Sequence, residues 1–387
     1  MPKPQKQVAL IIETYNEHAR RLLRGIRAFT DKNDTWVIHF RALGNYQEDL
    51  SWLQDWQGDG LIARITSEAI ASYVSQSNLP TLDLTSERLV PEVSYLEANN
   101  HAVANLAARH LLERGFKRFG FLGDSAFFWS RLREQHFCQA IDAQGFSCKS
   151  LDLCGASQSV PLSDLQDKIV AWLAEIPKPV GIMASSDVLG RLLLETCRLG
   201  DIKVPDEVAV IGVDNDTLLC ELADPPLSSV VLDAFRTGFL AASLLQQLMD
   251  GKKLESKAFH IDPLGVVTRP STEFYVTDDE QILGALSFIR THACNDIKVE
   301  DVLTVVPLSR RALEARFHKV TGRTPHEEIS RLKLQRVKEL LLEPGLSLQT
   351  IAELTGFKHP EYLSVFFKRE TGLSPSDYRN SYPSLLR

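Results

Sequence analysis

The chain has 387 residues, 44% of them hydrophobic and 24% charged, a size and composition that predict two or three folded domains and exclude a largely disordered chain. Its charge is unevenly divided: the residues from Gln281 onward hold 16 Lys and Arg against 12 Asp and Glu, a net charge of +4, whereas the first 280 residues hold 27 against 38, a net charge of −11. A basic C-terminal part on an acidic body indicates that one part contacts a polyanion.

No apolar run comes near the roughly 18 residues that a membrane-spanning helix needs, and the first seven residues lack the apolar core of a secretory signal. Six cysteines are scattered along the chain without a C-x-x-C pair. Neither a zinc site nor a disulfide framework is therefore indicated, and we expect a reduced, cytoplasmic protein.

From Val8 to about Leu254, short apolar strands alternate with amphipathic helices. This alternation is typical of βαβ units and parallel sheets. The segment is too long for one sheet of ordinary size, so we expect two packed α/β lobes. In chain order, strands are predicted at 8–12, 36–40, 60–65, 118–122, 180–184 and 208–213, and helices at 20–29, 100–114, 131–144 and 188–199.

The pattern changes at residues 255–279, where Pro and Gly between short Val, Phe and Tyr pieces predict one or two strands and then a linker. From Glu280 onward no strand pattern remains. We therefore divide the chain into an α/β domain at 1–275 and an all-α domain at 276–387. Helices of this second domain are predicted at 282–292, 299–305, 309–320, 325–342, 348–354 and 360–371.

Two stretches of the helical part share one layout, in which a short helix, a tight turn and a second helix follow one another. They occupy 298–319 and 347–369, and each is followed by the pattern Thr-Gly-x-Ser/Thr-Pro. A repeat of this kind, joined by one long helix at 327–342, predicts two helix-turn-helix motifs. Such motifs place their second helix in the major groove of DNA.

Each second helix has a predicted apolar face, formed by Leu313 with Phe317 and by Leu363 with Phe367. Arginine can bond guanine through two hydrogen bonds, and glutamate can accept one from cytosine. The side chains expected at base edges are Arg310, Arg311, Glu314, Ala315, His359, Glu361, Tyr362, Ser364 and Val365, with Lys368 and Arg369 on phosphates. A helical interaction domain with solvated arginines is the alternative, and the second matched copy disfavours it.

Residues 351–357, with 362–367 and 372–378, resemble the signature of the AraC/XylS family of transcription regulators. This resemblance covers the helical part and implies sequence-specific binding to double-stranded DNA. One departure is Pro307, where the family usually has a smaller residue, and it bears on how the first recognition helix docks.

The α/β part resembles the effector domain of the LacI family, which shares the fold of periplasmic sugar-binding proteins. The matching blocks lie at 100–123, 131–145, 184–187, 204–215 and 225–230. The resemblance implies a ligand site between two lobes. Unlike that family, this chain has only seven residues before its first strand, so we expect the DNA-binding helices at the other end.

Such a site suits a polyhydroxylated ligand, because carboxylates, amides and guanidinium groups satisfy sugar hydroxyls and an indole covers the apolar ring face. The resemblance makes Arg133 and Asp214 the first candidates. The further candidates are Glu13, Asn16, Asp83, Trp129, Ser186 and Asp187. Structural alternatives stay open: Trp129 as core, Asp187 as a helix N-cap and Glu13 as a solvated carboxylate.

The sequence contains no phosphate-binding loop, H-E-x-x-H, G-x-S-x-G or G-x-G-x-x-G motif. Asp214 and Asp216 fall short of the oxygen ligands that calcium needs. We therefore expect no metal, no cofactor and no enzyme activity. A sugar-acting enzyme and a periplasmic transport receptor are the rival hypotheses.

The order of the two modules resembles that of xylose operon regulators, and this implies D-xylose, or a related monosaccharide, as the effector. The sequence thus predicts an α/β two-lobed periplasmic-binding-protein-like domain followed by an all-α domain with two helix-turn-helix motifs. We expect a homodimeric activator that binds operator DNA and contacts RNA polymerase at a pentose-catabolic operon. A repressor that responds to another monosaccharide is the alternative.

Overall fold

The structure is a computed structural model of the chain, and it describes residues 5–33, 36–40, 50–53, 56–85, 87–154, 160–273, 277, 279–342 and 345–381. The chain divides into two compact units. The first comprises Met1–Leu112 and Phe116–Phe274, and the second comprises Glu113–Gly115 and Tyr275–Arg387. The expected domain boundary at residue 275 falls outside the described residues.

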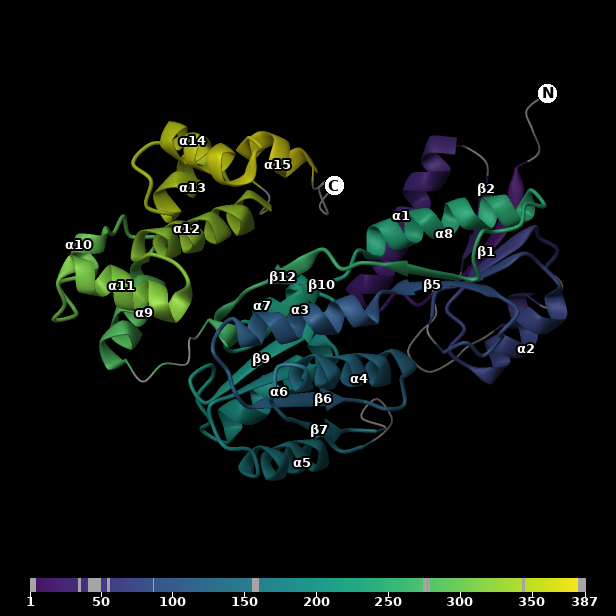
Figure 1. Cartoon of the computed structure of the whole chain (residues 1–387). Coiled ribbons are helices and arrows are strands. Elements are labelled where there is room, and N and C mark those ends of the chain that lie inside the picture. Colours follow the sequence, from purple (N-terminus) through teal and green to yellow (C-terminus); the bar gives the residue numbers. More distant parts are fainter. Residues whose placement is uncertain are drawn as a thin grey trace. The chain divides into compact units, whose positions relative to one another are not determined.

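The first unit contains two six-stranded sheets, each the centre of one lobe (Figure 1). The strands of the first sheet are β1 (Lys6–Ile11), β2 (Trp36–Phe40), β3 (Gly60–Ala63), β4 (Thr81–Asp83), β5 (Ser94–Ala98) and β11 (Ala258–Ile261). Those of the second are β6 (Phe119–Gly123), β7 (Cys148–Asp152), β8 (Val180–Ala184), β9 (Val208–Val213), β10 (Ser228–Val231) and β12 (Gly265–Val267).

The first sheet has the order β11-β5-β4-β3-β1-β2, and all its pairs are parallel. The second has the order β12-β10-β9-β8-β6-β7 and is parallel except where β12 pairs with β10. The helices of this unit are α1 (Glu17–Asn33), α2 (Glu68–Ser77), α3 (Asn100–Leu112), α4 (Phe128–Asp142), α5 (Leu162–Ala174), α6 (Asp187–Leu199), α7 (Thr217–Leu222) and α8 (Ala234–Met249).

Strand β1 shows why the sequences of these strands are continuous apolar runs. Val8 and Leu10 pack into one hydrophobic cluster, whereas Ala9 and Ile11 pack into another on the opposite face. A parallel strand with both faces covered has no polar side to alternate with. The predicted two-lobed α/β fold followed by a helical domain is confirmed.

The sequence analysis did not predict α2, α5, α7 and α8 of the first unit, nor β4, β5, β7 and β10. These strands have only three to five residues, and β7 is mostly polar and lies at the edge of its sheet. Short or edge strands give a weak periodic signal. Among the described residues, no helix combines the length and apolar character of a membrane span.

Helices α1 and α8 pack in close contact, and each contributes a glycine at the point where they meet. A Cβ built at Gly25 would come 2.0 Å from the backbone oxygen of Phe235, and one built at Gly238 would come 2.0 Å from the backbone oxygen of Leu22. Backbone atoms cannot rotate away as a side chain can. The separation of the two helices is therefore set by the absence of side chains at these two positions.

We expect Gly25→Ala to lower the free energy of unfolding of the first unit by about 2 kcal/mol, because the added methyl group forces the helices apart. Chemical denaturation of the full chain measures this change. Gly200→Ala is the matched control, since its Cβ would have no neighbour nearer than 3.4 Å. Equal stabilities of the two variants would contradict the proposed helix crossing.

The second unit is helical throughout its described part. Its helices are α9 (Glu280–His292), α10 (Val299–Val302), α11 (Arg310–Thr321), α12 (Pro325–Leu342), α13 (Leu348–Leu354), α14 (Pro360–Thr371) and α15 (Pro375–Ser381). Leu313 and Phe317 are buried in one cluster, and Leu363 and Phe367 are buried in a second. The predicted apolar pairs of both second helices therefore lie in the core.

The Thr-Gly pattern ends both of these helices in the same way. Thr321 Oγ1 donates to the backbone oxygen of Phe317 (2.9 Å), and Thr371 Oγ1 donates to that of Phe367 (2.7 Å). Each threonine also accepts from the backbone N–H two residues later. The glycine that follows each threonine has a positive φ, 71° and 77°, and so ends the helix.

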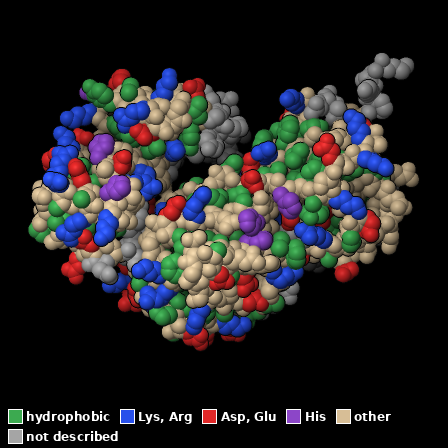
Figure 2. All heavy atoms as spheres, in the orientation of Figure 1, with side chains coloured by type: hydrophobic (Ala, Val, Ile, Leu, Met, Phe, Trp, Pro, Cys, Tyr) green, Lys and Arg blue, Asp and Glu red, His purple; other side chains and the backbone are tan. Residues whose placement is uncertain are grey.

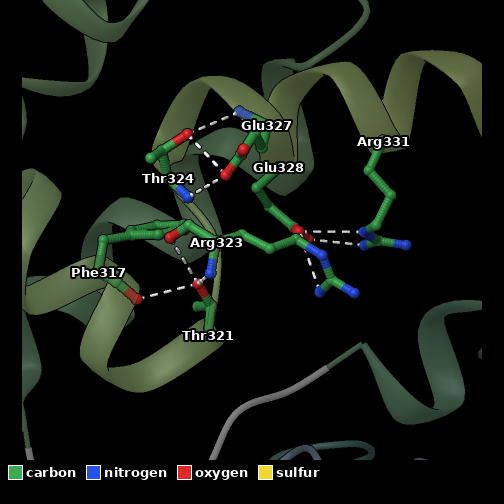
Figure 3. Close-up of polar contacts among 7 residues, drawn as sticks. All are labelled: Phe317, Thr321, Arg323, Thr324, Glu327, Glu328 and Arg331. Atoms are coloured by element: carbon green, nitrogen blue, oxygen red, sulfur yellow. Dashed lines mark hydrogen bonds and ion pairs between the residues drawn. The ribbon is translucent and has the colours of Figure 1, made fainter. Parts of the chain in front are cut away.

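The rest of the pattern starts the next helix (Figure 3). Thr324 and Glu327 form a capping box, in which the Thr324 N–H donates to Glu327 Oε2 (2.7 Å) and the Glu327 N–H donates to Thr324 Oγ1 (3.2 Å). Glu328, 3% exposed, accepts two hydrogen bonds from Arg331 at 2.7 and 3.0 Å. The Thr-Gly-x-Ser/Thr-Pro pattern found in the sequence thus determines how α12 follows α11.

Candidate ligand site and nucleic-acid interface

The candidate ligand residues lie where parallel strands end. Glu13 follows β1, Asp83 ends β4, and Asp214 follows β9. In open parallel sheets, ligands bind beside the carboxyl ends of the strands. Arg133 reaches the same region of the second lobe from α4.

Arg133 is 4% exposed and fixed by three contacts. Its Nε donates to Asn100 Oδ1 (3.0 Å), and its Nη1 donates to the backbone oxygen of Ser185 (2.5 Å). Its Cζ lies 4.7 Å from the centre of the Trp129 ring. Burial lowers the pKa of Arg133, and the charges of Asp214 and other acids oppose that shift.

Asp214 is the common partner of this charge cluster. Burial lowers the pKa of Arg133, Arg64 and His18, and the Asp214 charge opposes that shift at all three. Two of these three residues belong to the first lobe, because His18 lies on α1 and Arg64 follows β3. The two lobes therefore bring opposite charges to one place.

The Asp214 backbone has a φ of 107°, a conformation that costs a non-glycine residue on the order of 1–3 kcal/mol. Neighbouring bonds hold it there. The Asp214 N–H donates to the backbone oxygen of Val230 (3.0 Å), and the next N–H, that of Asn215, donates to Ser229 Oγ (3.0 Å). Arg269 Nη2 donates to Asn215 Oδ1 (2.9 Å). This network holds the backbone that carries the Asp214 carboxylate.

Three polar atoms of this region are buried and have no hydrogen-bond partner within the described part of the chain: His18 Nδ1, Arg64 Nε and Ser185 Oγ. Burial lowers the pKa of His18 and of Arg64. An unpaired buried polar atom costs free energy, so such a group in a native site needs an explanation. A bound polar ligand would satisfy these atoms.

Sequence reasoning missed His18, Arg64 and Ser185. The predicted strand 60–65 included Arg64, whereas β3 ends at Ala63, so Arg64 lies just beyond the strand. Its Nη1 pairs with Glu13 Oε1. A charged residue at the carboxyl end of an apolar strand was the available signal, and for His18 and Ser185 it was their position just beyond β1 and β8.

Four other candidates have their oxygens engaged in local structure. Asn16 Oδ1 accepts from the Ala19 N–H (2.7 Å) at the start of α1, and Ser186 Oγ accepts from the Leu189 N–H (3.4 Å) at the start of α6. The N-cap of α6 is Ser186 and not Asp187. Asp83, 3% exposed, accepts from the backbone N–H groups of Ile65 and Thr85.

Asp187 is 1% exposed and joins the start of α6 to β10 and to the segment that follows β9. Its Oδ1 accepts from Ser229 Oγ (2.6 Å), and its Oδ2 accepts from the Asp216 N–H (2.8 Å). Burial first, and then the Asp214 charge, raise the pKa of Asp187 to about 8. This carboxyl belongs to the network that holds the backbone beside Asp214, since the same Ser229 hydroxyl also accepts from the Asn215 N–H.

Trp129 is half-buried and already has two ring contacts. Its ring stacks on that of Phe127, with centroids 5.2 Å apart, and the Arg133 guanidinium lies over it. The indole therefore helps to orient Arg133. The described residues include no group of three or more His, Cys, Asp and Glu side chains suited to a metal ion.

The candidate DNA-reading helix α11 begins at Ser309, whose Oγ accepts from the Ala312 N–H (3.3 Å). Arg310 is exposed but paired, with Nη1 2.5 Å from Glu300 Oε1 and Nε 3.0 Å from Glu314 Oε1. Arg311 is exposed and makes no hydrogen bond or ion pair within the described part of the chain. Of the two arginines, Arg311 is therefore the one that is free to bind a partner.

The second helix, α14, presents apolar side chains to solvent: Tyr362 is 63% exposed and Val365 is 69% exposed. Apolar side chains of this kind contact thymine methyl groups in DNA complexes. Glu361, His359 and Lys368 are exposed as well. Figure 2 shows Lys and Arg side chains gathered along one edge of the helical unit.

The remaining candidates on these two helices differ in whether their side chains already have a contact within the protein. Ala315 is exposed on α11. Ser364 Oγ donates to the backbone oxygen of Pro360 (2.9 Å), and Arg369 pairs with Glu370 (2.8 Å). Both of these side chains would exchange an internal contact for one with DNA.

The raised pKa values of Asp187 and Asp83 make the stability of the folded chain depend on pH. Burial raises the pKa of Asp187 to about 8 and that of Asp83 to about 7, above the ordinary value of 3.8. The folded chain then binds these protons more tightly than the unfolded chain does. Their stabilising effect is therefore present at low pH and lost as the pH rises from about 4 to about 8.

We expect Asp187→Asn to flatten this pH dependence. From pH 5 to pH 8, its free energy of unfolding should rise relative to that of the wild type by on the order of 2 kcal/mol. Thermal unfolding across that range measures the effect. Asp206→Asn, at an exposed aspartate, is the control. Parallel pH curves for the Asp187 variant and the wild type would show that Asp187 is ionised in the folded protein.

Comparison with known proteins agrees with both halves of this description. Residues 108–272 match the family model of a periplasmic binding protein-like domain, and residues 303–381 match that of a helix-turn-helix domain. The chain is 29% identical over 385 residues to the xylose operon regulatory protein of Escherichia coli (strain K12), covering 97% of each chain. It is 28% identical over 387 residues to that of Haemophilus influenzae, covering 98% of this chain and 99% of the relative.

Among solved structures, the chain is similar to a xylose-binding transcription activator. The TM-score is 0.68 at 29% identity, and the match covers 98% of this chain and 99% of the other. The similarity thus extends through both units and includes the order in which they follow one another. The chain is therefore a DNA-binding transcription regulator that joins a periplasmic binding protein-like domain to a helix-turn-helix domain.

Proposed function

We propose that this regulator responds to a monosaccharide, D-xylose in the first place, and activates a pentose-catabolic operon. The observation that carries this proposal is the cluster at the strand ends in which the Asp214 charge acts on Arg133 of one lobe and on His18 and Arg64 of the other. The names of the relatives, which are xylose operon regulatory proteins, support the choice of sugar.

The cluster has the chemistry that sugar hydroxyls require, since each hydroxyl both donates and accepts. The Asp214 carboxylate accepts, and Arg133 Nη2, which no contact in the described residues uses, donates. His18 Nδ1, Arg64 Nε and Ser185 Oγ gain partners on binding. These five groups are the primary contacts of the proposed site.

The remaining candidates have supporting roles in this proposal. Glu13 holds Arg64, and Trp129 orients Arg133. Local hydrogen bonds already engage the oxygens of the other four, so they shape the strand ends around the ligand. Those four are Asn16, Asp83, Ser186 and Asp187.

We further propose that the regulator acts as a homodimer in the cytoplasm, binds double-stranded operator DNA and contacts RNA polymerase. Its 1–275 part binds the sugar without transforming it, and its 276–387 part reads the DNA. Sugar binding can alter operator affinity only if the sugar prefers the DNA-competent arrangement.

We expect Arg133→Lys to weaken D-xylose binding by about tenfold to a hundredfold, because lysine keeps the charge but loses the planar fork of donors. Titration calorimetry on the full chain measures the Kd. Gln135→Ala, at an exposed position of the same helix, is the matched control. A Kd within twofold of the wild type for Arg133→Lys would remove Arg133 from the site.

We expect Arg311→Ala to cost about 1–3 kcal/mol at one operator base pair and to relax specificity there. Lys368→Ala is the contrasting variant, expected to weaken binding to all sequences alike and to reduce the salt slope by about 1. Binding to a set of single-base operator variants measures both. A uniform loss for Arg311→Ala would make Arg311 a phosphate contact.

A further inference from the structure

Helix α4 begins without a cap from its own segment. Its N-cap residue is Phe127, whose side chain makes no capping hydrogen bond. The first N–H of the helix, on Phe128, donates instead to Glu87 Oε1 at 2.8 Å. Glu87 belongs to the segment after β4 in the first lobe, whereas α4 belongs to the second. One lobe therefore caps a helix of the other.

The next residue of the first lobe contacts the same phenylalanine. Arg88 Cζ lies 5.4 Å from the centre of the Phe128 ring and 4.8 Å from that of Tyr95. Its Nη2 is 3.5 Å from the buried Glu97 carboxylate, which belongs to β5 of the first lobe. Its φ of 56° is unusual for a residue with a Cβ. Arg88 is thus held from its own lobe while it reaches across to the other.

Phe128 accepts cations from both lobes. Arg131, one turn further along α4, lies with its Cζ 5.1 Å from the same ring. A carboxylate at a helix N-terminus and a guanidinium over a ring face are both favourable, and each becomes stronger when water is excluded. The two contacts made by Glu87 and Arg88 exist only while the lobes lie together.

We propose that Glu87 and Arg88 form a closure latch that positions the ligand-binding end of α4. Trp129 and Arg133 follow Phe128 on this helix by one and five residues, so a contact that fixes its first turn also fixes them. Apparent sugar affinity scales with the fraction of molecules in the closed arrangement. The latch raises that fraction, and it does so without touching the sugar.

The identity of the ligand rests on the proposed function, whereas the contacts of Glu87 and Arg88 do not. The experiment therefore tests the ligand and the latch separately. Hydrogen–deuterium exchange of the full chain reports the protection of the Phe128 amide, with and without D-xylose, and calorimetry reports the Kd for D-xylose. The variants are Glu87→Ala, Glu87→Gln and Arg88→Met. Glu92→Ala is the control, at an exposed glutamate of the same segment.

We expect Glu87→Ala to speed exchange at the start of α4 and to raise the Kd by about fivefold, the usual scale for a lost helix cap. Glu87→Gln keeps an acceptor oxygen, so its Kd should stay within about twofold. Arg88→Met should weaken binding without altering exchange in α5 or α6. The control should behave as the wild type in both measurements.

Two results would overturn the latch. A higher Kd with unchanged exchange in Glu87→Ala would make Glu87 a direct ligand contact, and its charge does act on Arg64. Wild-type exchange together with a wild-type Kd would show that the contact has no effect on α4. If the wild-type chain itself fails to bind D-xylose, the proposed effector is wrong, and exchange in the ligand-free variants still decides whether Glu87 caps α4.

Discussion

Buried charge of opposite sign, contributed by two separate lobes, is the constraint on which the first unit depends. Arg133 of the second lobe is almost fully buried, and the charge of Asp214 acts on it as well as on Arg64 and His18 of the first lobe. Charges are expensive to bury unless they are paired and hydrogen-bonded. Three nearby polar atoms lack partners among the described residues, and the proposed sugar is the ligand that would supply them.

The helical unit was the more predictable half, because its signals are local. The four apolar residues of its two second helices and the Thr-Gly pattern act within a few positions of their partners, and the repeat displays each twice. The ligand site depends on pairings between residues far apart in the chain. Arg64 pairs with Glu13 across 51 positions, and no sequence period encodes such a contact.

Burial explains why similar residues have different roles. Asp83 ends β4, Asp214 follows β9 and Asp187 begins α6 just beyond β8. Only the family resemblance, and not their position along the chain, made Asp214 the first candidate among them. The structure shows that Asp83 and Asp187 accept backbone N–H groups deep in the protein, whereas Asp214 has a strained backbone and its carboxylate accepts no hydrogen bond from the described residues. Tertiary hydrogen bonding, and not residue type, thus distinguishes a positioning carboxylate from a contact.

The account joins a sugar site in one unit to DNA-reading helices in the other, and such coupling must be reciprocal. The most direct test measures the operator Kd with and without saturating D-xylose, and the D-xylose Kd with and without operator, on the same full-length protein. The account predicts that both Kd values fall by the same factor, about fivefold or more. An operator Kd that does not change with D-xylose or any other monosaccharide, beside normal sugar binding, would contradict it.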